Sequence, residues 1–276
     1  MPRDLSVVRT GAVLCAIVAV TAIAAPWLPL DPNRIDLGRV LEAPSLAHWM
    51  GTDGLGRDVL SRLAHGARVS LGVGVGTAAI ALLIGLPLGA LAGYRGGFWD
   101  AVVSRAIEAV LCFPALLLAL ALLSVAPGWL SRLPETARLA LALGLVAWTP
   151  TARYLRAEFR RLRTSEAVLA ARAAGAGGWR IAVRHLLPQG IAPVLVTLAF
   201  GAAAASLAEA SLSFIGIGVA PPTASWGQML LEALRHMGRA WWLALFPGAA
   251  LFVTVYGFNR LAEGLRDWLD PRPLLR

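Results

Sequence analysis

Residues 69–94 read VSLGVGVGTAAIALLIGLPLGALAGY and contain no charged side chain. An α-helix rises 1.5 Å per residue and the hydrocarbon core of a bilayer is roughly 30 Å thick, so about 20 apolar residues make one crossing. This run exceeds that length. It predicts a membrane-spanning helix and, with it, a fold built around a lipid bilayer.

The composition of the whole chain agrees with a membrane protein. Of its 276 residues, 58% are hydrophobic and 15% are charged, and the mean hydropathy is +0.68. A soluble domain carries about 25% charged residues, so this chain has too few charges to cover a water-facing surface of its size. The composition excludes an ordinary soluble domain of this length.

Further apolar runs bring the predicted number of spans to six, with five or seven as alternatives. They are residues 10–30, 109–131, 139–152, 185–208 and 240–259. The run 139–152 is short, and Arg138 and Arg153 at its ends would extend to the membrane surface. The first run is longer than the 7–15 residues of a signal-peptide core, so we expect it to be retained as a signal anchor.

Residues 210–231 also lack charge but predict a loop. The adjacent Pro221 and Pro222 remove two backbone donors and favour an extended chain, and three glycines lie nearby. We expect the fifth span to end near residue 217 and an ordered external loop to follow it.

The distribution of arginine predicts the orientation. The net charge is +9, and the chain contains no lysine. Residues 153–184 carry eight arginines against two glutamates, whereas residues 31–68 carry equal numbers of arginines and acidic residues. Cytoplasmic loops concentrate basic residues, so 153–184 is predicted to be cytoplasmic and 31–68 external. Because the arginines lie between the spans, we expect no nucleic-acid partner.

The predicted organisation follows the chain in order. A cytoplasmic amino terminus (1–9) precedes the first transmembrane helix (10–30) and an external segment (31–68). A five-helix core (69–262) contains the long cytoplasmic loop 153–188, and a cytoplasmic carboxyl terminus (263–276) ends the chain. The sequence thus predicts an all-α, multi-pass membrane protein.

Residues 166–188 read EAVLAARAAGAGGWRIAVRHLLP and predict a helix–turn–helix hairpin. Thr164 or Ser165 can cap a first helix that alanine favours. Gly175 is placed to adopt the left-handed conformation that ends helices, and a second short helix is expected to end at Pro188. The residues alone leave two interpretations open, a docking surface for a partner protein or a segment that rests on lipid headgroups.

The hairpin resembles the EAA loop of permease subunits in binding-protein-dependent ABC importers. That pattern is Glu-Ala-Ala, three residues, Gly, nine residues, Ile, one residue and Leu-Pro. Leu169 stands in place of the Glu and His185 in place of the Ile, as is common in the dipeptide/oligopeptide/nickel branch of this family. The matching positions are Ala170, Ala171, Gly175, Leu187 and Pro188. Residues 48–71 and 210–227 resemble two further stretches of that branch.

The resemblance implies a type I ABC-importer permease fold with six transmembrane helices and a cytoplasmic coupling-helix loop. It implies a permease in the inner membrane of a prokaryote that forms half of the pathway for peptides, with nickel or another small solute as the alternative. The implied partners are a second homologous permease, two cytoplasmic P-loop ATPase subunits and an external substrate-binding protein. The implied ATPase-coupling residues are Glu166, Ala170, Ala171, Arg172, Gly175, His185, Leu187 and Pro188.

The chain itself is expected to be neither an enzyme nor a cofactor-binding protein. It contains no Gly-x-x-x-x-Gly-Lys-Ser/Thr sequence to hold phosphates, so ATP and Mg²⁺ are expected on the partner ATPase. Its four histidines lie in separate segments without the spacing of metal ligands, and we expect no metal site.

Glu209 is the candidate pathway residue. It falls within or near the end of the fifth span, where an ionisable group costs roughly 2.5–3.5 kcal/mol at the bilayer centre. It could face the pathway, pair with an arginine of the partner permease, or lie in water at the end of the span. A secondary transporter or channel is the alternative class of protein, because it would explain the spans and Glu209 without requiring the hairpin.

Overall fold

The computed structural model describes residues 5–27, 31–125, 128 and 130–269, and within them the chain is helical without a β-strand. Short 3₁₀ turns occur at Ala25–Trp27, Leu37–Arg39 and Leu130–Arg132. The α-helices are α1 (Leu5–Ala24), α2 (Val59–Arg95), α3 (Gly97–Leu111), α4 (Ala115–Ser124), α5 (Glu135–Leu162), α6 (Glu166–Ala173), α7 (Gly178–Ile181), α8 (Leu187–Phe214), α9 (Trp226–Leu234) and α10 (Trp242–Leu269).

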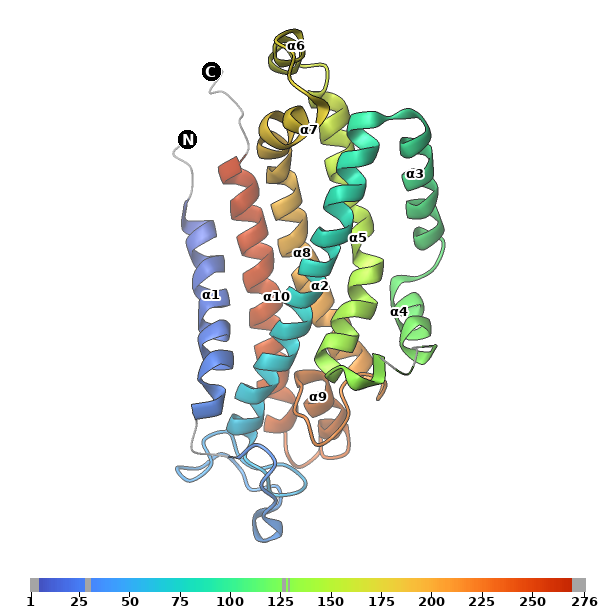
Figure 1. Ribbon diagram of the computed structural model, residues 1–276. Helices are drawn as coiled ribbons and strands as arrows, with labels where there is room; N and C mark the ends of the chain where they lie inside the picture. The colour runs from blue at the N-terminus through green and yellow to red at the C-terminus, as the bar shows by residue number, and fades with distance from the viewer. Residues whose placement is uncertain (1–4, 28–30, 126–127, 129, 270–276) are drawn as a thin grey trace.

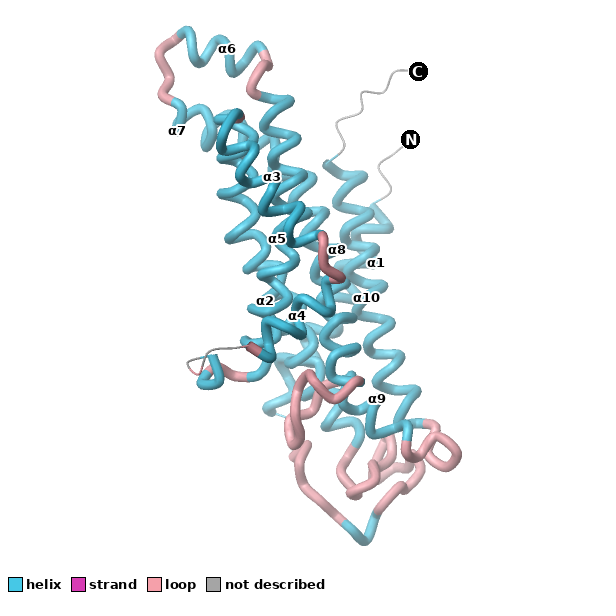
Figure 2. Tube along the Cα trace, turned by 90° about the vertical axis from the view of Figure 1, so that its right-hand side faces the viewer, coloured by secondary structure: helices cyan, strands magenta, loops and turns pink. Residues whose placement is uncertain are grey.

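The long helices form an elongated bundle whose two ends differ (Figure 1). α1 lies along α10, and α2 crosses the bundle to pack against α5 and α8. The amino end of α1, the carboxyl end of α10 and the hairpin of α6 and α7 lie at one end. The loop before α2 and the helix α9 lie at the other end (Figure 2). The separation of the segments that were predicted to be cytoplasmic and external is thus present in the structure.

Glycines at four-residue intervals allow α2 to lie directly against α5. A Cβ atom on Gly85 would come within 2.7 Å of Thr151, and one on Gly89 within 2.6 Å of the Ala152 carbonyl oxygen. Small residues let helix backbones approach closely in a membrane, where van der Waals packing replaces the hydrophobic effect between helices. The second predicted span is therefore fixed to the fourth by shape.

Four described helical segments are long and apolar enough to cross a membrane, namely Ser6–Trp27, Val59–Arg95, Gly178–Phe214 and Trp242–Leu269. The bent pair α3–α4 would be a fifth. The remaining predicted span, 139–152, lies within α5, which also carries arginines toward its carboxyl end. The prediction of an all-α, multi-pass chain is confirmed, and each of the six predicted spans falls on a helix or on the bent pair.

The third predicted span is not one straight helix. α3 and α4 meet at an angle of 89° across residues 112–114. Proline disfavours a helical conformation in the residue before it, so Pro114 separates the two helices. The amino end of α3 extends to Gly97, well before the predicted start of the span, and its Asp100 forms an ion pair with Arg156 of α5.

The second predicted span, 69–94, lies within a longer helix that starts before it. α2 begins at Val59, where the side chain of Asp58 accepts a hydrogen bond of 2.8 Å from the backbone N–H of Ser61. The first turns of this helix carry Arg62, His65 and Arg68. Because of these charges, the uncharged run 69–94 begins ten residues after the start of the helix.

Two predictions about the end of the hairpin and the following loop need correction. The second hairpin helix does not stop at Pro188, because α7 passes through a π-helical segment, Ala182–Leu186, into α8. There the N–H of Leu187 donates to the carbonyl of Ala182, and this wider turn accommodates the ring of Pro188. The predicted external loop 210–231 likewise contains the start of a helix, α9.

The chain termini are described in part. α1 and the following 3₁₀ turn account for the first predicted span up to Trp27, and residues 28–30 lie outside the described part. α10 continues to Leu269, so the predicted carboxyl-terminal segment 263–276 begins as helix. Residues 1–4 and 270–276 lie outside the described part.

Candidate functional site

The hairpin at one end of the bundle starts with α6, whose end is set by Gly175. Gly175 has a φ of +80°, as the sequence predicted. Its N–H donates to the carbonyl of Arg172 and the N–H of Ala176 to that of Ala171, both at 3.0 Å. These two bonds form a Schellman cap, which satisfies carbonyls at the end of a helix. The predicted side-chain cap at the other end is absent, since Ser165 occupies the N-cap without such a bond.

One face of the hairpin is packed into the bundle. Val168 of α6 is 0% exposed. It belongs to a cluster of buried residues from α5, α6, α7, the π segment and α8, namely Leu155, Phe159, Leu162, Val168, Ile181, Leu186 and Val194. Burial of a side chain of this size stabilises by about 1.5–3 kcal/mol. The hairpin is therefore fixed to the helices below it.

Most of the remaining surface of α6 is open to solvent. Leu169 is 51% exposed, and Glu166, Ala170 and Arg172 are exposed beside it. A Cβ atom on Gly175 would meet no atom within 4 Å. An exposed leucine among small side chains on a rigid helix is suited to docking into a groove on another protein.

The predicted coupling residues fall into two groups. Glu166, Ala170, Ala171, Arg172 and Gly175 lie on α6 or its cap. His185 lies in the π segment, and Leu187 and Pro188 lie in the first turn of α8. The second group therefore belongs to the connection between the hairpin and the bundle. From Gly178 to Phe214 that connection is continuous helix, so it links the hairpin to the far end of the bundle.

Glu209 lies near the far end of this helix, and its side chain is 0% exposed. The hydroxyl of Ser70 on α2 donates to its carboxylate at 2.7 Å, and that of Ser213 donates at 2.8 Å. The alternative that Glu209 lies in water at a helix end is wrong. A role in a pathway stays a prediction, and these contacts do not support it.

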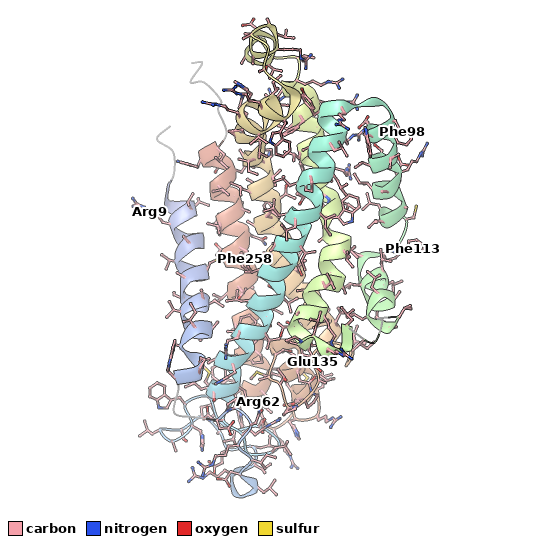
Figure 3. The ribbon with its side chains drawn as sticks, in the orientation of Figure 1. Arg9, Arg62, Phe98, Phe113, Glu135 and Phe258 are labelled. Carbon is pink, nitrogen blue, oxygen red and sulfur yellow. The ribbon has the colours of Figure 1, made fainter. Side chains whose placement is uncertain are left out.

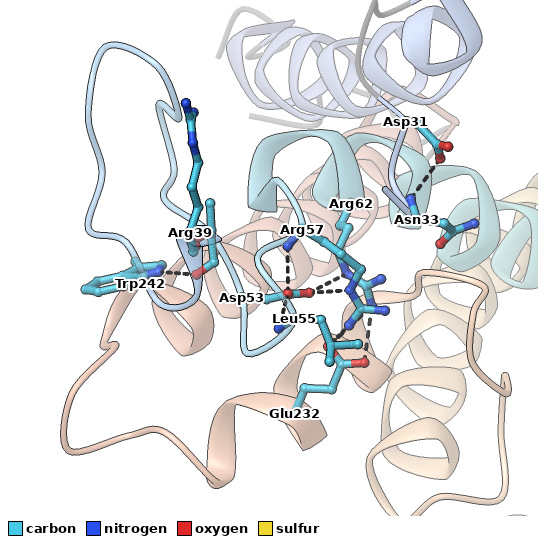
Figure 4. A network of polar contacts seen from close by, with 10 residues as sticks. Asp31, Asn33, Arg39, Asp53, Leu55, Arg57, Arg62, Glu232 and Trp242 are labelled. Atoms are coloured by element: carbon cyan, nitrogen blue, oxygen red, sulfur yellow. Dashed lines mark hydrogen bonds and ion pairs between the residues drawn. The ribbon is translucent and has the colours of Figure 1, made fainter. Parts of the chain in front are cut away.

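A network of ion pairs that the sequence did not predict holds the loop 31–58 to α9 (Figure 4). Asp53 accepts from Nε of Arg57 at 2.6 Å, and Arg57 and Arg62 reach Glu232 of α9 at 2.9 and 3.2 Å. Arg62 is 1% exposed. No short-range signal could have paired residues that lie more than 160 positions apart. Asp53, Arg57 and Arg62 all belong to the stretch 48–71 that resembles the dipeptide/oligopeptide/nickel branch.

Two of the cavities in the described part of the chain bear on the site. One of about 320 Å³ is bordered by α2, α5, α8 and the bend between α3 and α4, with Thr77, Pro150 and Gly201 among its lining residues. The other, of about 590 Å³, lies between the carboxyl end of α2 and the segment of α7 and α8 that carries the hairpin. Within the described part of the chain, no group of three or more His, Cys, Asp or Glu side chains could hold a metal ion.

Most of the chain matches a described protein family. Residues 85–274 match the binding-protein-dependent transport system inner membrane component family. This range includes the hairpin, the continuous helix behind it and the bend between α3 and α4. The matched range covers more than half of the chain.

Named relatives are similar over nearly the whole chain. A peptide transport permease of Brucella suis is 41% identical over 265 residues, covering 96% of this chain and 87% of that protein. A glutathione transport permease of Pectobacterium atrosepticum is 36% identical, covering 96% of this chain and 86% of that protein. A dipeptide transport permease of Alkalihalophilus pseudofirmus is 35% identical, covering 96% and 84%.

The fold is also similar to a solved structure. An inward-facing form of the MetNI methionine ABC transporter has a chain that matches with a TM-score of 0.62 and 16% identity, covering 76% of this chain and 96% of that one. At this identity the match concerns the fold alone. It confirms the type I importer permease fold that the sequence predicted.

Proposed function

The chain belongs to the family of binding-protein-dependent transport system inner membrane components. We propose that its hairpin docks on a separate ATPase subunit and transmits the movement of that subunit to the bundle. The chain is the translocation subunit of an ATP-driven importer. The observation that supports the coupling role is the continuity of Gly178–Phe214, which joins the exposed hairpin to the far end of the bundle. A load applied to α6 would reach this helix through the buried contacts of Val168 with its cluster, and would then be carried along one helix.

The proposed docking surface is the exposed face of α6. Val168 and its cluster hold the inner face in place, so α6 would move together with α5 and α8. Leu169 would enter an apolar pocket of the ATPase, with Glu166 and Arg172 as polar contacts at the edge. ATP and Mg²⁺ would be bound by that partner, because this chain has no sequence that cradles phosphates.

The proposed assembly contains two cytoplasmic ATPase subunits, a second homologous permease and an external substrate-binding protein. The hairpin end carries eight arginines between residues 153 and 184, so we assign it and both chain termini to the cytoplasm. The loop 31–58 and α9 would then face the binding protein on the outside.

The proposed substrates are short peptides. The three relatives described above are named for the transport of peptides, glutathione and dipeptides. The walls of the 320 Å³ cavity are apolar residues, glycine and threonine, which suits solutes of varied side chain. In this proposal selection among peptides occurs mainly in the binding protein.

The test is purification of the tagged chain from its native membranes in mild detergent, with the co-purifying proteins identified by mass spectrometry. Recovery of a second permease and of P-loop ATPase subunits is the expected result. Recovery of the chain alone, in a detergent that keeps other importers of the same membranes intact, would contradict the proposal. ATP hydrolysis by the recovered complex, stimulated by binding protein loaded with dipeptide, would then test the substrate class.

A further inference from the structure

We propose that the groove between α2 and α7 binds an anionic phospholipid. Its volume is about 590 Å³, and Leu86, Pro87, Leu91, Tyr94, Trp179 and Val183 are among its lining residues. Arg95 is the one charged residue in its lining. The groove is open along one side of the bundle at the hairpin end.

The length of the groove along α2 matches the thickness of one leaflet of a bilayer. Its lining on α2 extends from Leu86 to Arg95, the last residue of the helix. This is about 14 Å along the helix axis at 1.5 Å per residue, close to half of the roughly 30 Å hydrocarbon core. Tyr94, in the last turn of α2, and Trp179, in α7, lie at the hairpin end of the lining, as aromatic residues do at membrane interfaces, and Trp179 is 82% exposed. An acyl chain can therefore enter from the leaflet while its headgroup stays at the surface.

The charges around the open end are complementary to a phosphate headgroup. Arg95 lies in the lining, and Arg180 and Arg184 lie on the helical segment that forms the opposite wall. All three are exposed, and within the described part of the chain no ion pair involves them. By contrast, Arg156 and Arg160 of α5 pair with Asp100. The arginines beside the groove thus remain available to an anionic ligand.

The position of the groove separates it from the proposed ATPase surface. α6 is the outermost element of the hairpin end, and α7 lies between it and the bundle (Figure 2). A lipid in the groove would contact Ala182 and Val183 of the π segment, through which the hairpin is joined to α8. Its occupancy would brace that joint, so the lipid composition of the membrane would modulate coupling.

The test is native mass spectrometry of the purified chain after incubation with equal amounts of phosphatidylglycerol and phosphatidylcholine. The wild-type chain is expected to retain phosphatidylglycerol preferentially. Arg180→Gln and Arg184→Gln should each lower that preference about fivefold, the equivalent of about 1 kcal/mol per arginine at a membrane surface. Val183→Trp, which fills the groove from an exposed position, should lower retention of both lipids.

The matched control is Arg9→Gln. Arg9 is an exposed arginine on α1 at the same end of the bundle but away from the groove (Figure 3). Equal retention of the two lipids by the wild type, or equal losses in the Arg9 and Arg180 variants, would overturn the proposal. So would loss of bound lipid when ATPase subunits are present, because the groove would then belong to the protein partner. The comparison of the wild type with the variants uses the chain without ATPase, so its outcome is independent of the proposed function.

Discussion

The hydroxyl of Ser70 on α2 donates a hydrogen bond of 2.7 Å to the carboxylate of Glu209 on α8, across 139 positions of sequence. Ser213, one turn further along α8, donates to the other carboxylate oxygen at 2.8 Å and accepts from the N–H of Val219 in the turn that follows. Glu209 therefore joins α2, α8 and the chain leading to α9. α8 continues without a break to the hairpin, so Glu209 anchors the far end of the continuous helix Gly178–Phe214.

Replacement of Glu209 by alanine should destabilise the chain. It would leave the hydroxyls of Ser70 and Ser213 buried without their acceptor, at about 1–3 kcal/mol for each unsatisfied group. The apparent Tm of the detergent-purified chain should fall by several degrees, measured as the monodisperse fraction after heating. Ser211→Ala is the control, because Ser211 donates to the carbonyl of Leu207 within its own helix. Equal Tm values for the two variants would contradict the anchoring role.

Gly175→Val should abolish transport-coupled ATP hydrolysis and leave membrane insertion intact. Gly175 has a φ of +80°, where a residue with a side chain is strained by about 1–2 kcal/mol and a β-branched one by more. The strain would undo the cap of α6 and misplace its docking face. Insertion is measured by the yield in the membrane fraction and coupling by the stimulation of ATP hydrolysis.

Gly177→Val is the matched control for this experiment. Gly177 lies two residues further on with a φ of −67° and a ψ of 154°, an extended conformation that valine favours, and a Cβ atom there would meet nothing within 4 Å. Full coupling in the Gly177 variant and none in the Gly175 variant is the expected pattern. Full coupling in both would refute the requirement for a rigid α6.

Asp53→Ala should release the loop 31–58 from α9. Asp53 accepts the backbone N–H of Leu55 at 2.8 Å and pairs with Arg57, and its loss would leave Arg57 and the buried Arg62 with Glu232 as their acidic partner. Removing one member of a buried pair costs about 3–5 kcal/mol. Limited trypsin digestion should therefore cleave faster at Arg34 and Arg39.

Asp31→Ala provides the comparison for the loop. Asp31 accepts the N–H of Asn33 at 2.9 Å in an exposed turn of the same loop and lies outside the ion-pair network (Figure 4). Its removal should leave the cleavage rate close to that of the wild type. Cleavage that is equally fast in both variants would mean that any change in the loop opens it, and that the network has no special role.

Most of the architecture could be predicted from the sequence because lipid imposes a simple requirement on composition. Uncharged runs of sufficient length located α1, α2, α8 and α10, and the glycine pattern located the end of α6. The predictions failed where local chemistry overrode composition. Asp58 starts α2 within a charged segment, and a π turn carries the helix past Pro188.

The contacts at the end of the bundle away from the hairpin could not have been predicted from one sequence. Glu209 was identified as an unusual residue, but its partner Ser70 has no pattern that distinguishes it from other serines. The same holds for Arg62 and Glu232, which are 170 positions apart. Such pairs follow from the way α2 lies against α8 and α9, and single-sequence periodicity does not report that geometry.

The two faces of α6 can be tested through the adjacent residues Val168 and Leu169. Val168 is 0% exposed and Leu169 is 51% exposed. Val168→Ala should lower the apparent Tm of the isolated chain, because it removes buried methyl groups worth about 0.8 kcal/mol each. Leu169→Asp should leave that Tm unchanged, because its side chain touches water in the isolated chain. It should instead reduce the amount of ATPase that co-purifies, since a carboxylate would be driven into the apolar pocket proposed for the partner.

The control for Leu169→Asp is Leu46→Asp, which makes the same change at a position that is 96% exposed in the loop 31–58. This variant should retain both its Tm and its ATPase, because the loop lies at the opposite end of the bundle. Retention of ATPase by the Leu169 variant at the level of the Leu46 variant would show that α6 does not use this face for docking. Loss of ATPase in the Leu169 variant with an unchanged Tm would separate docking from folding, and would identify Leu169 as a contact of the coupling surface.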